Sequence, residues 1–408
     1  GGGSSSSDSS EAAEGGLSVG KRMQQAVMTG VSYMVPFVAA GGLLLALGFL
    51  VGGYQIGEQV NGIDPWKQFV TEYSLTNLPP TTVDFDGKEV AFAYPAFALY
   101  LGSVLFATGQ AAMGFVVAAL SGYISYAMAG RPGIAPGFVG GAISVTLGAG
   151  FIGGLVTGLL SGAVAMWLGN QKVPKVLQSL MPVVIIPLGT SLVVGLVMFL
   201  LLGRPLAAIL SGLQNWLTSM SGSSALLLGV ILGLMMCFDL GGPVNKAAYL
   251  FATAGLSTGD EASLKIMAAV MGAGMIPPIA LSIATMLRKN LFTAAEQENG
   301  KSAWLLGLSF ISEGAIPFAA SDPLRVIPAT MAGGAVTGAI SMVLGVGSRA
   351  PHGGIFVFFA ISPLIGWIIA LVAGIAVSTV LIIALKQFWP NKTLMAQAAK
   401  DTAQAVAA

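Results

Sequence analysis

The residues best suited to chemistry stand in three short segments where Gly and Pro interrupt otherwise apolar sequence. Pro removes a backbone donor and Gly permits unusual dihedral angles, so each interruption frees backbone N–H and C=O groups. Within a membrane, such groups are tolerated only where they face protein or water. The pattern predicts interrupted helices that share a polar site. The segments are Cys237–Lys246, Ile311–Phe318 with the following Ser321-Asp322-Pro323, and Arg349–Gly354.

These segments carry the hydrogen-bonding groups that a sugar needs. Sugar hydroxyls both donate and accept, carboxylates accept strongly, and amides and neutral imidazoles do both. Carboxylate, amide and imidazole groups occur together here, which favours a polyol as the ligand. The predicted substrate-binding residues are Glu313, His352, Asp239, Asn245, Gly242 and Ser312.

Each of these side chains also has a purely structural interpretation. Glu313 could form a buried ion pair with Arg325 or Lys246, and His352 could be a satisfied histidine at a helix end. The two cations could attract a phosphoryl group, but neutralising buried carboxylates is the favoured interpretation. Helix capping is the alternative for Asp239 and Asn245, and it is the main interpretation of Asp322.

Composition places these residues in a membrane protein. Of 408 residues, 55% are hydrophobic and only 9% are charged, and the mean hydropathy is +0.83, whereas soluble domains carry about 25% charged residues. A net charge of +1 gives no indication of nucleic-acid binding. Since about 20 apolar residues span the hydrocarbon layer, we expect an all-α polytopic protein with about ten membrane elements. The longest apolar runs are Val31–Val51, Ala91–Ala129, Gly137–Gly169, Val176–Gly203, Ser224–Phe238, Ala262–Leu287 and Ile355–Leu385.

Ionisable residues divide the chain into two halves. Before Gly203 almost none is expected at membrane depth, whereas six are expected there after Ser223. These are Asp239, Lys246, Glu313, Asp322, Arg325 and His352. Charges at membrane depth are costly and mark function, so the second half is predicted to handle substrate. The expected organisation is a flexible linker or cloning remnant (1–16), a scaffold and dimerisation domain (17–203), an amphipathic connector (204–222), a substrate-binding transport domain (223–385) and a cytoplasmic tail (386–408).

The distribution of charge predicts the orientation. The loop Tyr54–Val90 is mostly acidic and should face outward, because Lys and Arg concentrate on the cytoplasmic side. Both termini are therefore expected in the cytoplasm, which requires an even number of crossings. The Lys and Arg residues that indicate cytoplasmic segments are Lys21, Arg22, Lys172, Lys175, Arg288, Lys289, Lys301, Lys386, Lys392 and Lys400.

Four stretches carry a family resemblance. GVSYMVPFVAAGGLL, FDLGGPVNKAAY, ISEGAIPFAASDP and APHGG resemble the fructose-specific enzyme IIC of the bacterial phosphoenolpyruvate-dependent phosphotransferase system, in the glucose-fructose-lactose superfamily. The resemblance covers nearly everything after residue 17. It implies a homodimer in the lipid of the bacterial inner membrane, with a mobile transport domain that has two re-entrant hairpins and moves like an elevator. It also implies that a phosphocysteine of an enzyme IIB domain, supplied by soluble phosphotransfer proteins, converts fructose to fructose 1-phosphate.

The resemblance also assigns roles to individual residues. The essential glutamate of the family matches Glu313, which is expected to bind sugar hydroxyls and to accept the proton of the attacking hydroxyl. Relatives for glucose and disaccharides carry their key histidine before the glutamate, whereas His352 follows it. The FDLGGPVNK stretch lies where those relatives have their first hairpin, so Asp239 or Asn245 could take that role.

The phosphoryl carrier is not expected in this chain. Cys237 is the lone cysteine, and apolar neighbours such as Met236 and Phe238 would raise its pKa and disfavour the reactive thiolate. One cysteine and one histidine also predict no disulfide framework, no metal site and no cofactor.

Two other functions compete with this interpretation. An ion-coupled secondary transporter would use the same broken helices, with Asp239 or Glu313 binding H⁺ or Na⁺. An intramembrane hydrolase would use Ser309 and His352, but the residue after Ser309 is Phe310 rather than Gly, and no His-Glu-x-x-His motif is present.

The sequence also contains one internal echo. Residues 153–161 and 333–341 share a Gly-Gly-x-Val-Thr-Gly pattern, which indicates either a duplication or, preferably, common packing chemistry.

Overall fold

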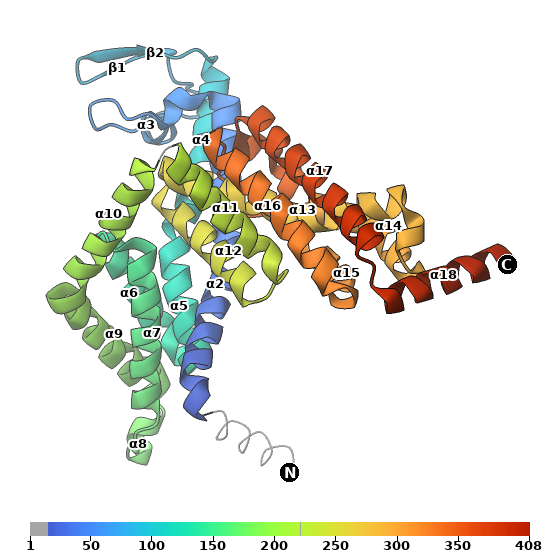
Figure 1. Ribbon diagram of the computed structural model, residues 1–408. Helices are drawn as coiled ribbons and strands as arrows, with labels where there is room; N and C mark the ends of the chain where they lie inside the picture. Colours follow the sequence, from blue (N-terminus) through green and yellow to red (C-terminus); the bar gives the residue numbers. More distant parts are fainter. Residues whose placement is uncertain (1–14, 221) are drawn as a thin grey trace. The chain divides into compact units, whose positions relative to one another are not determined.

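The protein is almost entirely helical. The computed structural model describes residues 15–220 and 222–408. Among these residues, seven helical stretches are long and apolar enough to cross a membrane, which confirms the prediction of an all-α polytopic protein (Figure 1). The stretches are Val19–Gly52, Ala96–Ala129, Gly150–Gly169, Met181–Ser219, Glu261–Leu287, Pro323–Val343 and Leu364–Phe388.

Several stretches differ from the predicted apolar runs. Ser224–Phe238 lies in a helix too short to be a candidate span, and the stretch Met181–Ser219 continues past the predicted end at Gly203. Pro323–Val343 was not predicted as a run, because Pro323, Arg325 and Pro328 dilute its hydropathy. The run Ile355–Leu385 divides into a short 3-10 segment and a separate long helix that begins at Leu364.

The chain forms two compact units. The first contains the described part of Gly1–Val38 and Ala111–Trp216, and the second contains Ala39–Gln110 and Leu217–Ala408. The boundary after Trp216 lies inside the predicted connector, while residues 39–110 cluster with the half that is predicted to bind substrate. Helices α2 (Gly15–Gly52) and α4 (Ala96–Gly114) each contribute to both units.

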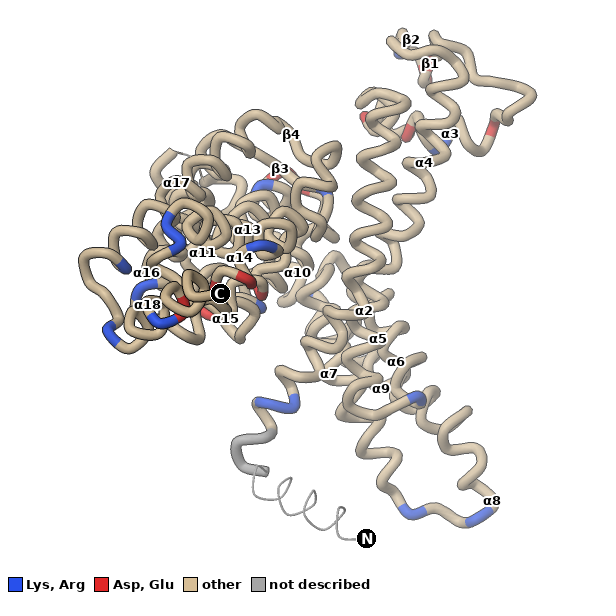
Figure 2. The backbone as a smooth tube through the Cα atoms, turned by 90° about the vertical axis from the view of Figure 1, so that its right-hand side faces the viewer, with Lys and Arg blue, Asp and Glu red and all other residues tan. Residues whose placement is uncertain are grey.

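The first unit is a helical bundle in which α5, α6 and α7 approach closely. A Cβ atom added to Gly141 would lie 2.6 Å from the Cα atom of Ala118, so only glycine permits this contact. The buried hydroxyls of Ser121 and Thr157 lie 2.8 Å apart and satisfy one another. Figure 2 shows that charge is sparse along α2, α5, α6, α7 and α9. The elements are α5 (Val116–Ala129), η2 (Arg131–Gly133), α6 (Ile134–Thr146), α7 (Gly150–Gly169), α8 (Lys175–Gln178), η3 (Met181–Ile185), α9 (Ile186–Val197), η4 (Met198–Leu202) and α10 (Gly203–Ser219).

The second unit is built around α13 (Glu261–Leu287). In the most apolar part of this helix, 94% of the sequence is buried inside the protein. The reason is that α11, α14, α16 and α17 pack around it. The fully buried Trp367 of α17 anchors this core by donating from Nε1 to the carbonyl of Ala268 at 3.2 Å. The helices are α11 (Ser223–Phe238), α12 (Pro243–Gly255), η5 (Leu256–Thr258), η6 (Lys289–Leu291), α14 (Ala294–Leu308), η7 (Ser312–Ala315), α15 (Ile316–Ser321), α16 (Pro323–Val343), η8 (Gly354–Ala360), α17 (Leu364–Phe388) and α18 (Lys392–Ala407).

The acidic loop after α2 contains a small hairpin. Strand β1 (Thr82–Phe85) pairs antiparallel with β2 (Lys88–Ala91), with Phe85 opposite Lys88. The turn residues Asp86 and Gly87 both have positive φ, as a two-residue hairpin turn requires. Around it lie η1 (Tyr54–Gly57) and α3 (Pro65–Glu72), while β3 (Gly347–Ser348) pairs with β4 (Ile361–Ser362) elsewhere in the unit.

Helices α11 and α16 pack through glycines of the internal echo. A Cβ atom on Gly338 would collide with the carbonyl oxygen of Gly229, and one on Gly334 would lie 2.8 Å from the carbonyl oxygen of Gly233. In the first unit, a Cβ on Gly158 of α7 would lie 2.8 Å from Cβ of Ile124 on α5. Both copies of the pattern thus serve close helix packing, the preferred explanation of the echo.

The close contact of Gly338 with α11 predicts that Gly→Ala substitutions at two positions have opposite effects on the free energy of unfolding. We expect Gly338→Ala to lower the free energy of unfolding by about 1–3 kcal/mol, because the added methyl group overpacks against backbone. Gly212→Ala in α10 meets no atom within 4 Å and should stabilise its helix by about 0.5–1 kcal/mol. Thermal unfolding in detergent measures both, and an equal effect of the two substitutions would contradict the packing argument.

Candidate functional site

The first interruption lies between α11 and α12. The carboxylate of Asp239 accepts from the backbone N–H groups of Val244 at 2.8 Å and Asn245 at 2.9 Å. The buried Asn245 side chain donates in turn to the carbonyl of Met236 at 2.7 Å. Both residues therefore stabilise the interruption itself, as their capping interpretation requires. Contact of either residue with a ligand stays a prediction.

The central helix anchors the first two interruptions. Its Pro277-Pro278 pair lacks two backbone donors, which frees the carbonyls of Ala273-Gly274 four residues earlier. The thiol of Cys237 donates to the first of these carbonyls at 3.2 Å. The hydroxyl of Ser312 donates to the second at 2.6 Å. Ser312 thus holds the second interruption against α13, and Cys237 is a buried structural donor.

The third interruption packs directly against the second. Phe310 adopts a positive φ of 67°, which is uncommon for a bulky residue and turns the chain sharply after α14. Gly354, with φ of 60°, sits so close to the carbonyl oxygen of Leu308 that any side chain there would collide with it. The chain after Arg349 is thereby held beside the start of the second interruption.

Three aromatic rings join all three segments. The Phe310 ring centroid lies 5.1 Å from that of His352 and 5.9 Å from that of Tyr249 on α12. The Tyr249 and His352 rings are 6.5 Å apart and meet edge to face. The structure therefore brings together three interruptions that are distant in sequence, with the first and third about a hundred residues apart.

Glu313 lies at this junction with an exposed carboxylate. A Cβ atom on Gly241 would be 2.8 Å from its Oε1 atom, so the first interruption can approach Glu313 only because it has a glycine there. Among the ion pairs of the described residues none includes Glu313. Arg325 pairs with Asp322 instead, and Lys246 is exposed. The predicted alternative of an ion pair with Arg325 or Lys246 is therefore not found there.

Two features of its surroundings affect the pKa of His352: packing against the neighbouring rings and the carboxylate of Glu313. Burial against the neighbouring rings lowers the pKa of His352, and the negative charge of Glu313 raises it to a smaller extent. The imidazole is consequently neutral at pH 7, with one donor and one acceptor nitrogen available for a hydroxyl.

His352 provides a direct test of this geometry, because it is the single histidine of the chain. We expect NMR titration of labelled histidine to give a pKa below the ordinary value of about 6.5. Glu313→Gln should lower it further, because removing a negative charge disfavours the imidazolium. Glu298→Gln, an exposed change on α14, serves as the control. An unchanged pKa in Glu313→Gln would show that the two side chains do not interact.

A second cluster of ionisable groups is structural. Lys386 donates to the carboxylate of Asp322 at 2.8 Å and lies 3.8 Å from that of Glu296, and all three are almost fully buried. Asp322 precedes α16 but its side chain makes no cap hydrogen bond, so its predicted capping role is wrong. Arg325 also pairs with Asp322, at 3.3 Å, which confirms that this cation neutralises a buried carboxylate. Lys386, predicted to begin a tail, belongs to α17.

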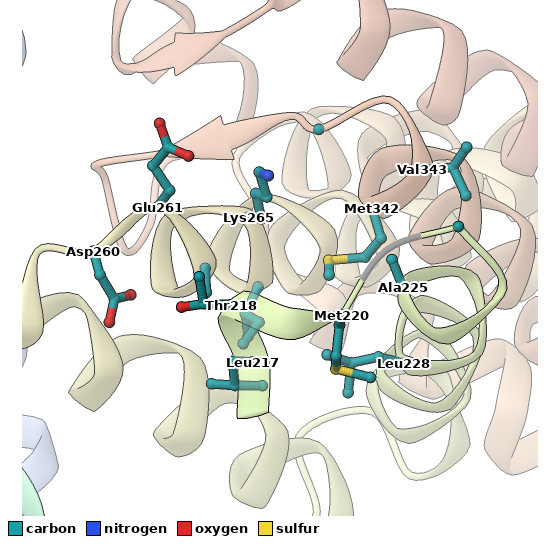
Figure 3. Close-up of a pocket in the computed structure, with 14 residues that line it drawn as sticks. Leu217, Thr218, Met220, Ala225, Leu228, Asp260, Glu261, Lys265, Met342 and Val343 are labelled. Atoms are coloured by element: carbon teal, nitrogen blue, oxygen red, sulfur yellow. The ribbon is translucent and has the colours of Figure 1, made fainter. Parts of the chain in front are cut away.

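The second unit also contains two cavities lined by other residues. The cavity in Figure 3, of about 430 Å³, lies among the start of α13, the end of α16 and the segment around Met220. Asp260, Glu261 and Lys265 supply its charged groups. The other, of about 510 Å³, is lined by Arg349 and several aromatic residues. Arg349 begins the third predicted segment but was not among the predicted substrate-binding residues, and Tyr249 and Phe310 lie just outside the predicted segments.

Together these features define a class: a polytopic membrane protein with a polar site made from interrupted helices. Residues 28–333 match the family described as "Phosphotransferase system, EIIC". The chain belongs to this family. No solved structure matches this chain.

Its curated relatives differ in length. The chain is 45% identical over 377 residues to the "PTS system fructose-specific EIIB'BC component" of Escherichia coli, covering 91% of the chain but 59% of that protein. It is 39% identical over 397 residues to the "PTS system fructose-specific EIIC component" of Haloferax volcanii, covering 93% of the chain and 96% of that protein. The "Fructose-like permease IIC component 2" of Escherichia coli is 36% identical, covering 90% and 91% respectively. The chain thus spans little more than half of the fused relative and nearly all of the others.

Proposed function

We propose that this chain binds fructose, carries it inward and presents it for phosphorylation to fructose 1-phosphate. The phosphoryl donor would be a phosphocysteine of an enzyme IIB domain. Membership of the phosphotransferase IIC family and the names of the fructose-specific relatives support this proposal. The observation that carries it is the junction of three helix interruptions at Glu313, an exposed carboxylate with no cationic partner among the described residues.

The chemistry at this junction follows from the groups present. A hydroxyl of the sugar would donate to Glu313 and transfer its proton to the carboxylate as the hydroxyl oxygen forms a bond to phosphorus. The phosphorus–sulfur bond of the phosphocysteine breaks, and the sulfur leaves as a thiolate. His352 would orient another hydroxyl of the same sugar. The residues proposed to bind substrate are Glu313, His352, Asp239, Asn245, Gly242 and Ser312, with the last four acting chiefly by holding the interruptions.

The carrier cysteine is assigned to the partner domain. Cys237 is buried and donates to a backbone carbonyl inside the unit, so it offers no accessible thiolate to a donor protein. The fused IIB domains in the names of several relatives support such a partner. Soluble phosphotransfer proteins would supply the phosphoryl group in turn.

The finer architecture belongs to the same proposal. We infer a homodimer in the bacterial inner membrane with both termini in the cytoplasm. Residues 17–203 would act as scaffold and 223–385 as an elevator-like transport domain with two re-entrant hairpins. The interruptions after α11 and α14 are the natural turning points of such hairpins.

The chemical form of the accumulated sugar tests this proposal. Membrane vesicles with the partner proteins and phosphoenolpyruvate should accumulate fructose only as its phosphate ester, and Cys237→Ala should leave this reaction intact. Free fructose inside the vesicles, with uptake that collapses on adding an uncoupler and ignores phosphoenolpyruvate, would instead support the ion-coupled alternative.

A further inference from the structure

The cavity of about 510 Å³ lies in the second unit, between the end of α2 and the β3–β4 region. Its volume falls in the range of about 300–1,000 Å³ that is usual for small-molecule sites. The lining is mainly aromatic and aliphatic, with one guanidinium and one hydroxyl as side-chain polar groups apart from two tyrosines. The lining residues are Ala46, Phe49, Leu50, Tyr54, Tyr94, Leu264, Gly347, Arg349, Phe359, Ala360 and Ser362.

Arg349 is the polar centre of this cavity. Its guanidinium lies 4.9 Å from the centroid of the Phe49 ring. Within residues 15–220 and 222–408, it takes part in none of the ion pairs or side-chain hydrogen bonds. The backbone of Arg349 is fixed, because its N–H donates to Ala360 at 3.0 Å and its carbonyl packs against Gly42. The guanidinium of Arg349 therefore lines the cavity from a fixed backbone, and its donors have no hydrogen-bond partner among the described residues.

Aromatic rings surround this fork. The rings of Phe49 and Tyr54 lie 5.0 Å apart. Tyr54 and Tyr94, which also line the cavity, are exposed. Rings with a polar tip suit a ligand that has both apolar C–H faces and hydroxyl groups. The lining thus combines guanidinium donors with aromatic faces, and a sugar offers both hydroxyl acceptors for the donors and C–H groups for the rings.

The cavity in Figure 3 does not have these properties. Its carboxylate Asp260 is occupied as the N-cap of α13, accepting from the backbone of Ser263 at 2.8 Å. Glu261 and Lys265 bring opposite charges to its edge (Figure 3), and its lining has no aromatic ring. The unused donors and aromatic faces distinguish the Arg349 cavity.

We propose that the Arg349 cavity is an entrance subsite where fructose binds weakly before it reaches Glu313. Arg349 would donate to sugar hydroxyls while the rings of Phe49, Tyr54 and Tyr94 contact the C–H faces. The segment that carries Arg349 also carries His352 three residues later, so one rigid turn of chain contributes to both sites. Tyr54 and Tyr94 flank the acidic loop that is expected to face outward, which places the subsite on the entry side. This inference rests on the proposed transport function.

Transport in vesicles of opposite orientation tests the subsite. Arg349→Gln should raise the KM for uptake into right-side-out vesicles about tenfold, the effect of losing one hydrogen bond to a charged group. Tyr94→Ala should raise the same KM, because it removes a ring that contacts the C–H face of the sugar. They should leave the KM for phosphorylation unchanged in inside-out vesicles, where sugar enters from the other side. Lys88→Gln, on the exposed strand β2, is the control and should change neither. Equal KM changes in both orientations, or none, would overturn the subsite.

A binding measurement separates failure of this inference from failure of the transport proposal. In Glu313→Gln protein, saturation-transfer NMR should still detect weak contact with fructose, and adding Arg349→Gln should abolish it. Arg349→Lys keeps the charge and loses the fork, so it should weaken the signal while preserving the fold. If Glu313→Gln protein gives no signal although the wild type binds fructose, the subsite is wrong and the site at Glu313 stands. If the wild type neither binds nor transports fructose, the transport proposal itself fails.

Discussion

Replacement of Glu313 by Gln is expected to reduce fructose phosphorylation by about 10²–10⁴-fold, the usual contribution of a general base. The substitution keeps the size of the side chain but removes its negative charge and its ability to take a proton. Because Glu313 is exposed and belongs to none of the ion pairs of the described residues, the fold should be unaffected. The measurement is the rate of fructose 1-phosphate formation by membranes supplied with phosphorylated IIB domain.

Glu298→Gln is the matched control. Glu298 also lies in the second unit, but its carboxylate is solvent-exposed and pairs only with Lys301. Its variant should phosphorylate fructose at the wild-type rate. Thermal unfolding of both variants should match the wild type. A Glu313→Gln protein that phosphorylates fructose normally would remove this carboxylate from the mechanism.

Replacement of Lys386 by Met is expected to cause the largest loss of stability, about 3–5 kcal/mol. The ammonium group lies between the carboxylates of Asp322 and Glu296, and the three side chains are only 1–4% exposed. Removing the cation leaves two negative charges in a low-dielectric interior, with only the guanidinium of Arg325 beside one of them. The loss should be visible as a lower midpoint of thermal unfolding in detergent.

A surface pair shows why burial determines this effect. Lys301 lies 3.0 Å from Glu298, nearly the same distance as Lys386 from Asp322. The side chains of Lys301 and Glu298, however, are 74% and 75% exposed. Lys301→Met should therefore change stability by about 0–1 kcal/mol. If the two methionine variants unfold at the same temperature, the buried cluster does not hold α14, α16 and α17 together as described.

Much of the fold could be predicted from composition and from Gly and Pro. Low charge and long apolar runs predicted a helical membrane protein, and the three interrupted segments were located from their Gly and Pro residues. Pro323–Val343 was missed as a span because an average of hydropathy cannot tell that Arg325 is paired in the interior. The same limitation placed Lys386 in a tail, since its partners Asp322 and Glu296 are distant in sequence.

The candidate site was predicted in part for a related reason. Glu313 and His352 were chosen for their chemistry, and the structure brings their segments together. The rings of Tyr249 and Phe310 that join those segments could not be chosen, because an isolated aromatic residue in apolar sequence resembles any core residue. The positive φ of Phe310 is set by tertiary packing and leaves no trace in the sequence. The sequence shows Gly241 as one member of a glycine pair, and its approach to Glu313 could not be predicted from that pair.

A structure of the protein in lipid nanodiscs with bound fructose would show whether Glu313 binds the sugar. We expect sugar density at the junction of the three interruptions, with one hydroxyl about 2.6–3.2 Å from the Glu313 carboxylate and His352 beside the same molecule. If fructose is bound only at another place in the second unit and makes no contact with the Glu313 carboxylate, the proposed site is wrong.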